Sequence, residues 1–422
     1  MRFSLLCLLP VFAFARDIPV PDMEAFADAV KTAQPGDSLV LSEGEWKDVQ
    51  MRFKGVGTQD KPITLKASTA GKTVFTGNSR LQVGGHFLRV EGLHFRDPAQ
   101  TTGEVIELRA DSKMLAYHCV VSDCAVTAST PVDLGKKTAR FVSLYGTSNT
   151  VEHCVFEGKT TGGTTFVIWF TPGGEGRHVI RGNYFGPRPQ LGKNGGETIR
   201  IGDSETHDTN AKCEVVGNLF YQCNGEGEII SVKSNENHFA DNTFLECEGA
   251  LTLRHAHRCV VENNAFIGNH KKQTGGVRII GEDHQVRGNY LENLGGDGYR
   301  AAFSFMKGIP HSPANGYYEV KNVVLSHNTA IDCKVTLAIG EGSRKEASLP
   351  PVNCTVKDNI FVSPTKQLIA LTAIGAGWTW QNNVMSGKSI GMEGLAGIIG
   401  NKATVKKPRT LTRQDVGVKW LP

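Results

Sequence analysis

The sequence lacks any large surplus of one charge. Its 46 Lys and Arg residues nearly balance its 42 Asp and Glu residues, so the formal net charge is only +4. A protein that binds nucleic acid through its surface usually carries a clear, clustered basic excess, so this class is disfavoured. The composition, with 48 Gly, 17 Pro and 21% charged residues, also excludes collagen, a coiled coil and a disordered chain.

Long apolar runs are absent after residue 15. No later segment reaches the roughly 20 apolar residues that cross a bilayer, so we expect no membrane span. The first 15 residues do contain an apolar stretch, which follows Arg2 and ends in Ala13-Phe14-Ala15. This pattern predicts a secretory signal peptide over residues 1–15 and a secreted or periplasmic protein. A buried N-terminal helix or a membrane anchor is the alternative interpretation.

Helical periodicity is also scarce, and one short sequence motif recurs instead. An Asn is followed two residues later by an apolar residue, and successive copies are 22 to 39 residues apart. Cys119 and Cys154 fit the same frame in the place of Asn. A repeat of roughly 20 to 30 residues with insertions is typical of a solenoid. The repeated asparagines are Asn183, Asn218, Asn242, Asn264, Asn289, Asn328, Asn359 and Asn383.

The repeat predicts how the chain coils. Side chains two residues apart on a strand share a face, so each Asn and its apolar partner should both point inward. In a parallel stack, whose turns (rungs) lie about 4.8 Å apart, the asparagines would form a hydrogen-bonded ladder at a tight bend. We therefore predict an all-β, single-domain, right-handed parallel β-helix over residues 16–400, with coils that begin before Leu93.

The ends of such a coil need caps, because an exposed core edge would pair with another chain. Residues 23–32 place Phe26, Ala29 and Val30 on one helical face and are followed by Pro35-Gly36. We predict that this helix caps the N-terminal end. Residues 401–422 lose the repeat, and we expect them to form a closing segment.

The cysteines after the predicted signal peptide cannot all pair in disulfides, because their number is odd. Without Cys7, which lies in the predicted signal peptide, nine cysteines remain. Cys223, Cys247 and Cys333 each follow a repeated Asn by five residues, which predicts stacked thiols inside the core. A disulfide between Cys223 and Cys247, on adjacent rungs, is the alternative.

The densest polar patch surrounds two glutamates. Glu226 and Glu228 are two residues apart, so their carboxylates should point the same way, and flanking glycines leave room for an ion. Two like charges this close need a cation or a raised pKa. With Asn194, one rung earlier, they form a set of oxygen ligands suited to Ca²⁺. A solvated acidic edge is the simpler alternative.

Two cations lie one rung apart beside this patch. Lys233 and Arg254 are 21 residues apart, whereas the repeated Asn242 and Asn264 are 22 apart, so the cations should lie almost in register. With nothing acidic directly between them, arginine should lower the pKa of the lysine, because arginine itself hardly deprotonates. A lysine that can lose its proton can act as a base.

This set of residues favours elimination from a uronic acid polymer. The base would remove the C5 proton next to a carboxylate whose charge a metal neutralises. The leaving oxygen would receive a proton from Arg254, a tyrosine or water. Hydrolysis is disfavoured because a metal that binds both glutamates denies them the acid and base roles, and the chain has no Asp-Asp dipeptide.

These motifs resemble those of polysaccharide lyase family six, the alginate lyases and chondroitinase B. The similarity covers about residues 17–365 and is carried by the segments 194–202, 226–234, 253–255 and 275–279. The resemblance implies Ca²⁺ on Asn194, Glu226 and Glu228, Lys233 as the base and Arg254 as the acid.

The resemblance implies substrate contacts less directly. Arg200, His255 and Arg278 match positions in the family's cleft, and Tyr145 and Tyr317 are further candidates. For the two tyrosines simple packing is the alternative, and His255 could be structural. The sequence around Arg278 looks more like the alginate lyases. We expect the chain to lack the second β-helix domain that some alginate lyases of this family append, which leaves exo or endo action open.

Three hypotheses follow for the whole protein. The first is a Ca²⁺-dependent lyase that acts on alginate, as a monomer. The second is a lyase for dermatan sulfate or another sulfated uronate glycan. The third is a noncatalytic β-helix adhesin or carbohydrate-binding protein, for which the clustered charges would be a coincidence.

Overall fold

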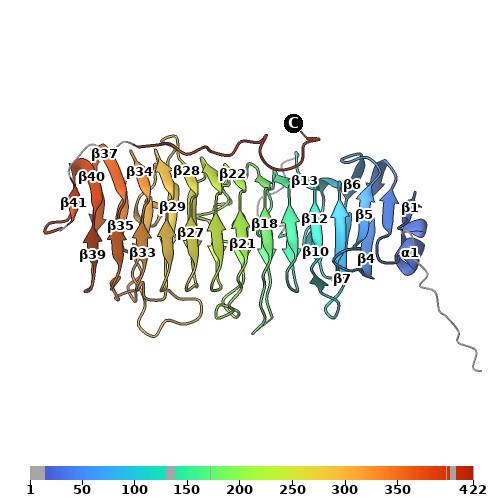
Figure 1. The fold of residues 1–422 in the computed structure, drawn as a ribbon, viewed down its shortest axis with the longest axis horizontal. Helices are drawn as coiled ribbons and strands as arrows, with labels where there is room; N and C mark the ends of the chain where they lie inside the picture. The colour runs from blue at the N-terminus through green and yellow to red at the C-terminus, as the bar shows by residue number, and fades with distance from the viewer. Residues whose placement is uncertain (1–14, 130–137, 172, 396, 400–404, 422) are drawn as a thin grey trace, which may run out of the picture.

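The chain forms a long rod of stacked parallel rungs in the computed structural model (Figure 1). The structure describes residues 15–129, 138–171, 173–395, 397–399 and 405–421. Three long parallel sheets run the length of the rod, and each rung contributes a strand to each sheet in turn. This arrangement confirms the predicted parallel β-helix, and its coils begin well before Leu93.

The first sheet has 14 strands. Their order along the rod is β1 (Asp17–Val20), β2 (Ser38–Leu41), β5 (Ile63–Ala67), β8 (Leu88–Glu91), β12 (Val120–Ser122), β15 (Thr150–Glu152), β18 (Val179–Arg181), β21 (Glu214–Val216), β24 (His238–Ala240), β27 (Val260–Glu262), β30 (Gln285–Arg287), β33 (Val324–Ser326), β36 (Thr355–Lys357) and β39 (Thr379–Gln381).

The second sheet has 13 strands and carries the candidate site. Its main path is β11 (Ala116–Tyr117), β7 (Arg80–His86), β10 (Glu104–Leu108), β14 (Arg140–Leu144), β17 (Phe166–Ile168), β20 (Ile199–Ile201), β23 (Glu228–Val232), β26 (Gly249–Leu253), β29 (Thr274–Ile279), β32 (Phe303–Met306), β35 (Leu337–Glu341) and β38 (Ile369–Leu371), and β4 (Gln50–Val56) pairs with β7.

The third sheet has 14 strands. They are β3 (Gly44–Lys47), β6 (Thr73–Gly77), β9 (His94–Pro98), β13 (Ala125–Thr127), β16 (Val155–Glu157), β19 (Tyr184–Phe185), β22 (Leu219–Tyr221), β25 (Thr243–Leu245), β28 (Ala265–Ile267), β31 (Tyr290–Glu292), β34 (Thr329–Ile331), β37 (Ile360–Gln367), β40 (Asn383–Ser389) and β41 (Ile398–Ile399).

The predicted asparagine ladder is present at the bend between the first and third sheets. All eight repeated asparagines are buried, and each side-chain amide from Asn183 to Asn359 donates to the side-chain oxygen of the next, at 2.9 to 3.1 Å. Cys154 extends the ladder, since its backbone amide donates to Asn183 Oδ1. Two positions on, phenylalanine rings stack inside the core, as Phe220 and Phe244 do at 4.6 Å. The ladder and the stack together hold neighbouring rungs in one register.

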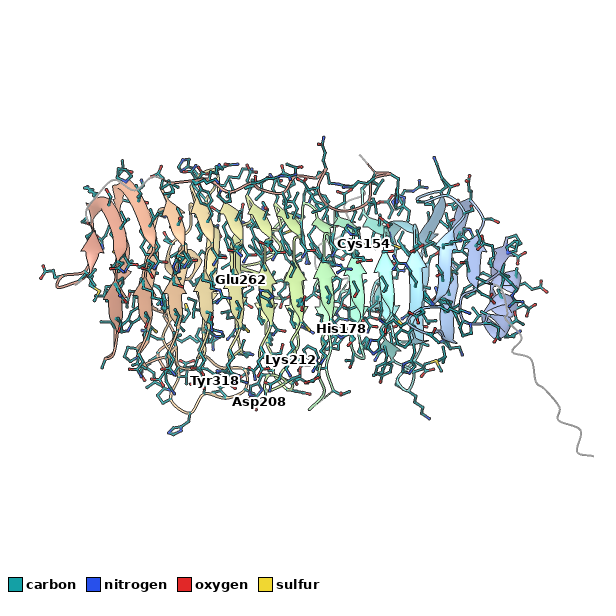
Figure 2. All side chains as sticks on the ribbon, viewed as in Figure 1. Cys154, His178, Asp208, Lys212, Glu262 and Tyr318 are labelled. Atoms are coloured by element: carbon teal, nitrogen blue, oxygen red, sulfur yellow. The ribbon has the colours of Figure 1, made fainter. Side chains whose placement is uncertain are left out.

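A second, mixed ladder lies at the bend that precedes the first sheet. Here the side chain of a histidine or an asparagine accepts a hydrogen bond from the backbone amide one rung earlier. His178 Nδ1 accepts from Asn149, Asn237 Oδ1 accepts from Cys213, and His284 Nδ1 accepts from Cys259, at 3.1 to 3.2 Å. His178 is labelled in Figure 2. These bonds require an unprotonated ring nitrogen on each histidine.

The cysteines are core residues. The nine cysteines that the structure describes are all free and buried, which confirms the expectation of core thiols. The alternative, a disulfide between Cys223 and Cys247, is wrong. Each of these thiols lies 3.4 Å from a backbone carbonyl of the preceding rung, Phe185 O for Cys223 and Phe220 O for Cys247. The thiols thus satisfy the backbone without a covalent bond.

The N-terminal cap is the predicted helix α1 (Met23–Thr32). Asp22 caps it, because its carboxylate accepts a hydrogen bond from the backbone amide of Ala25 at 2.9 Å. Phe26 and Ala29 are buried against the first rungs. Within the described ranges, no helix has the length and apolar character needed to cross a membrane.

The C-terminal segment runs back along the third sheet towards the N-terminal half of the rod (Figure 1). Val416 and Val418 are buried against Tyr184 and Leu219. The amide of Gly417 donates to Gly182 O at 2.7 Å. Residues 401–404 and 422 of the predicted closing segment, and residues 1–14 of the predicted signal peptide, lie outside the described residues.

Removing one member of the asparagine ladder should destabilise the rod. Asn242→Ala leaves the amides of Asn218 without their acceptor in a buried bend, so we expect a loss of about 3 kcal/mol in the free energy of unfolding. Denaturant titration measures this loss. Asn78→Ala, at an exposed position, is the control. Equal losses for the two variants would contradict a role for the ladder.

The second ladder should make stability depend on pH. Burial lowers the pKa of His284 to about 4, whereas an unfolded histidine titrates near 6.5. On acidification the unfolded chain therefore binds a proton that the folded chain does not bind. The free energy of unfolding should fall by about 3 kcal/mol per such histidine as the pH drops from 6.5 towards 4. His284→Asn keeps an acceptor, as Asn237 does, and should flatten this pH dependence in thermal denaturation. An unchanged slope would contradict the assignment.

Candidate active site

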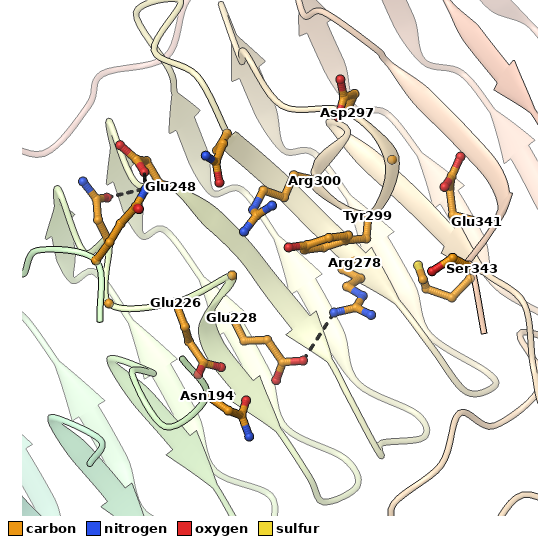
Figure 3. A pocket seen from close by; sticks show the side chains of 18 of the residues that line it. Asn194, Glu226, Glu228, Glu248, Arg278, Asp297, Tyr299, Arg300, Glu341 and Ser343 are labelled. Atoms are coloured by element: carbon orange, nitrogen blue, oxygen red, sulfur yellow. Dashed lines mark hydrogen bonds and ion pairs between the residues drawn. The ribbon is translucent and has the colours of Figure 1, made fainter. Parts of the chain in front are cut away.

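A groove of about 640 Å³ lies on the outer face of the second sheet. Figure 3 shows its acidic side, where the side chains of Asn194, Glu226 and Glu228 lie close together. Arg278 and Tyr317 line the same groove. The structure thus gathers five of the predicted site residues in one place. Four of them belong to the rungs of β20, β23 and β29, which stack with β26 in the order β20, β23, β26 and β29, and Tyr317 comes from the loop after β32.

Glu226 lies in the turn before β23 and contacts the preceding rung. Its Oε2 accepts hydrogen bonds from the backbone amides of Gly195 at 2.6 Å and Gly196 at 3.0 Å. Burial, followed by the charges of Glu197 and Glu228, raises the pKa of Glu226 to about 7. Glu226 therefore sits in a site where extra negative charge is unfavourable and a cation would be favourable.

Glu228 begins β23 and faces two arginines. Its Oε1 lies 3.3 Å from Arg254 Nε and 3.3 Å from Arg278 Nη1. Its Oε2 accepts a hydrogen bond from the hydroxyl of Ser231 at 2.6 Å. Glu228 consequently joins the acidic side of the groove to its basic side.

The predicted metal ligands fit a hard cation by their chemistry. Glu226, Glu228 and Asn194 offer carboxylate and amide oxygens on one groove wall. Glu197 adds a third carboxylate nearby, and its Oε2 is buried without a hydrogen-bond partner. Within the described ranges, no cluster of three or more His, Cys, Asp and Glu side chains is arranged to hold a metal ion. The candidate set therefore depends on the amide of Asn194.

Lys233 and Arg254 occupy adjacent rungs in the predicted register. Ser231 pairs with Thr252, and both cations follow two residues later. Both charges act on the same neighbour, His255. Lys233 is half-buried and its amine makes no hydrogen bond or ion pair with any residue that the structure describes. Neither cation belongs to the hydrophobic core.

An acidic group beside this pair was not expected. We expected nothing acidic directly between the two cations, and the structure adds Glu228 against Arg254. A β-bulge between Glu228 and Ile230 shifts the register of β23 on β26, which places Glu228 opposite Ala250. The guanidinium of Arg254 also donates to Gly316 O at 3.0 Å. Arg254 is thus anchored on two sides.

His255 is buried beside the cations. Burial, and then the charges of Arg254 and Lys233, lower the pKa of His255 to about 3, so its ring is neutral at ordinary pH. Neither ring nitrogen has a hydrogen-bond partner among the described residues. The rings of His255 and Tyr318 are nearly perpendicular, with 6.4 Å between their centres. Tyr318 and Asp208 lie close together at the lower edge of the rod (Figure 2).

Tyr317 lies among three arginines. Its hydroxyl accepts a hydrogen bond from Arg278 Nη2 at 2.7 Å. The guanidinium of Arg254 lies 4.3 Å from the centre of the ring, and that of Arg344 lies 4.6 Å away. Cations over an aromatic face are attracted to it. The loop after β32 therefore brings a phenol hydroxyl to the catalytic candidates.

Arg200 and Tyr145 lie further along the rod. Arg200 pairs with Ser231 one rung before the candidate base. Tyr145 follows β14, three rungs before β23, and lines a separate pocket of about 350 Å³. Both side chains contact Trp169, since Arg200 lies 4.6 Å from its ring and Tyr145 stacks on it at 6.3 Å.

Sequence reasoning missed several residues of the site. Tyr299 and Arg300 line the groove from a 3-10 helix, η1 (Gly298–Arg300), and Arg344 lines it after β35. The 39-residue interval between Asn289 and Asn328 was a signal, because such an insertion often forms a binding loop. Arg188, which is buried, donates to the carbonyl of Glu197 at 3.0 Å and supports the loop that carries Asn194.

Comparison with known proteins places the chain in a family. The family model described as Chondroitinase B matches residues 20–418. The alginate lyase AlyGC of polysaccharide lyase family 6 is 34% identical, with a TM-score of 0.90 over 96% of this chain. This chain spans only 59% of the length of AlyGC.

Two further solved structures cover more of their own length. A mannuronic acid specific family 6 lyase from the human gut microbiota is 29% identical, with a TM-score of 0.82 over 88% of this chain and 86% of its own. The family 6 lyase Pedsa3628 from Pseudopedobacter saltans is 26% identical, with a TM-score of 0.79 over 96% and 99%. No curated protein matches the chain. Because the family model covers most of its length, the chain belongs to the chondroitinase B family, polysaccharide lyase family six.

Proposed function

We propose that the chain is a Ca²⁺-dependent polysaccharide lyase that cleaves 4-linked uronic acid polymers, alginate first, by β-elimination. One observation carries the proposal. A lysine that forms no ion pair with any described residue stands one rung from an arginine, and that arginine contacts Glu228 of the oxygen-rich set Asn194, Glu226 and Glu228. General bases and charge-neutralising groups are both needed where a proton leaves the carbon next to a carboxylate.

Lys233 would take the C5 proton of the uronate. The electron pair of the broken C5–H bond then forms the C4–C5 double bond, and the C4–O4 bond to the next sugar breaks. Arg278 and Arg254 would orient the substrate carboxylate through charged hydrogen bonds. When bound by Asn194, Glu226 and Glu228, Ca²⁺ would neutralise that carboxylate and so favour loss of the neighbouring proton.

The leaving O4 needs a proton, and the site offers two side chains besides water. Arg254 lies beside the base, and burial lowers its pKa, which favours donation. Tyr317 presents a hydroxyl within the same cluster of arginines. His255 is neutral and buried, which favours the alternative that it has a structural role beside the two cations. The family resemblance favours Arg254 as the acid.

Alginate is the favoured substrate because the most similar proteins above are described as alginate or mannuronic acid lyases. Dermatan sulfate is the second candidate, since the matching family model is described as Chondroitinase B. Ultraviolet absorbance of the new C4–C5 double bond, followed on each polymer with Ca²⁺ present, tests the choice. A rise in absorbance on dermatan sulfate alone would select the second candidate. No rise on any uronate polymer would favour the hypothesis of a noncatalytic protein.

Export through the signal at residues 1–15 and action as a monomer are also part of the proposal. The support for export is the charge, apolar run and Ala13-Phe14-Ala15 ending of that segment. The N-terminal sequence of protein recovered from the periplasm or medium tests it.

Lys233→Ala should remove turnover without unfolding the rod. A general base contributes about 10² to 10⁴ in rate, and the side chain lies outside the core, so at least a hundredfold loss is expected. The absorbance assay measures the loss, and circular dichroism checks the fold. Lys357→Ala, at a half-buried lysine of the first sheet, should keep full activity. Substantial turnover by Lys233→Ala would exclude this residue as the base.

Chelation should remove activity and spare the fold. The rod is held by its own stacked core, so its melting temperature should change little while the rate falls by about a hundredfold or more. Calorimetry should show Ca²⁺ binding that Glu226→Gln weakens at least about tenfold. Glu262→Gln, on the first sheet, is the matched control (Figure 2). Unfolding at the same chelator concentration would mean that the metal is structural.

A further inference from the structure

We propose that Arg188 is a positioning residue for the proposed cation site, because its buried side chain holds the loop that carries Asn194 against the turn that carries Glu226. The inference rests on the proposed function and names a residue that would set the affinity of that site from behind its ligands. Arg188 follows the third-sheet strand β19, and its exposed fraction is only 3%.

Arg188 occupies a position that other rungs fill with a thiol. It follows a repeated asparagine by five residues, as Cys223 does, and Arg188 and Cys223 form a parallel bridge. One rung earlier, Lys159 follows Cys154 by the same interval. Two adjacent rungs therefore carry a cation where the stack of core thiols would otherwise continue. Burial of a charge is costly, so each cation must be held by other polar groups.

Lys159 is held by a single loop. It is buried, and its Nζ donates to Thr161 O, Thr161 Oγ1 and Gly162 O at 2.6 to 2.8 Å. These oxygens belong to the loop before β17. Neither Lys159 nor Arg188 forms an ion pair with any residue that the structure describes. Lys159 therefore fixes the loop before β17 and has no hydrogen bond to the loop of Asn194.

The guanidinium of Arg188 joins two loops. Its Nη1 and Nη2 donate at 2.7 to 3.2 Å to four acceptors, which are the backbone oxygens of Thr161, Gly163 and Glu197 and the hydroxyl of Thr165. Glu197 lies just before β20, at the end of the loop that begins after Arg188 and contains Asn194. Arg188 thus closes that loop on itself and ties it to the rung before. A planar fork of donors suits this arrangement, and the single amine of lysine cannot reproduce it.

The same residue supports the turn of Glu226 on the next rung. A Cβ added to Gly225 would lie 2.9 Å from Arg188 Nε, so this turn packs directly on the guanidinium. The backbone amide of Asn224 donates to Arg188 O at 2.9 Å. The carboxylate of Glu226 points back to the loop of Asn194, whose backbone amides donate to it at 2.6 and 3.0 Å. The two proposed ligands are therefore placed relative to each other by Arg188.

The charge of Arg188 does not itself favour a bound cation, because two positive charges repel. Burial lowers the pKa of Arg188 to about 10, and the charges of Glu197, Cys223 and Glu226 raise it, so the guanidinium stays protonated at ordinary pH. Any gain in cation binding must therefore come from the hydrogen bonds that hold the loops. A substitution that keeps the charge and removes the fork separates the two effects.

The test measures Ca²⁺ binding to the full chain by calorimetry. Arg188→Lys keeps a positive charge but leaves several loop oxygens without a donor, so the Kd for Ca²⁺ should rise at least about tenfold. Lys159→Met is the matched control, because it removes a buried cation that holds only the loop before β17. Both variants should lower the melting temperature, but Lys159→Met should leave the Kd for Ca²⁺ unchanged.

Kinetics separate positioning from a general loss of structure. With Ca²⁺ far above its Kd, Arg188→Lys should recover nearly the full kcat, whereas Lys233→Ala should stay inactive at every Ca²⁺ concentration. Thr165→Val guards against misfolding of the first variant, since it removes one acceptor of Arg188 and no part of the loop of Asn194. It should weaken Ca²⁺ binding about threefold.

The outcomes separate the positioning role from the lyase function. Unchanged Ca²⁺ affinity in folded Arg188→Lys overturns the inference, and so does an equal loss of affinity in Lys159→Met. If Arg188→Lys does not fold, unchanged affinity in Thr165→Val overturns it instead. If the unaltered chain cleaves no uronate polymer while Arg188→Lys weakens Ca²⁺ binding, the lyase function fails and the positioning role stands. If the unaltered chain binds no Ca²⁺, the positioning role and the calcium dependence are both overturned.

Discussion

The register between rungs is the constraint on which the site depends. Each turn places an asparagine amide directly over the next, as Asn242 does over Asn264 at 2.9 Å. A buried amide that lost this partner would be costly, so a slip of one residue is strongly disfavoured. Once the register is held, residues that are distant in sequence must become neighbours. Lys233 and Arg254 occupy the same position on adjacent rungs for this reason.

The groove brings together carboxylates that repel one another and arginines that pair with a carboxylate. Glu226 stands near two other carboxylates, whereas Glu228 is shared by Arg254 and Arg278. Glu228 thus joins the proposed cation site to the proposed site for a substrate anion. The loop with Tyr317 packs against Arg254, whose guanidinium lies 4.3 Å from the ring centre and donates to Gly316 O, and this partial burial strengthens its attraction to Glu228.

Most of the fold and the centre of the site could be predicted from short patterns. The Asn repeat predicted the stacked rungs, and the 21-residue interval between Lys233 and Arg254 predicted that these cations lie on adjacent rungs. The errors arose where the chain departs from the regular coil. A bulge beside Glu228 brought an acid to Arg254, and insertions supplied Tyr299, Arg300 and Arg344. Cys223 and Cys247 are free thiols, each within hydrogen-bond distance of a backbone carbonyl.

By itself, the sequence determined the coil, its N-terminal helix and the candidate residues for acid, base and metal chemistry. These follow from local spacing, since strand and helix periods decide which side chains share a face. Only the tertiary structure decided which tyrosine joins the arginines and where the second pocket lies. Tyr317 and Tyr145 are alike in the sequence, but a long loop folds one onto Arg254 and the stacking of rungs leaves the other beside Trp169. Loop conformation depends on distant contacts that no local pattern encodes.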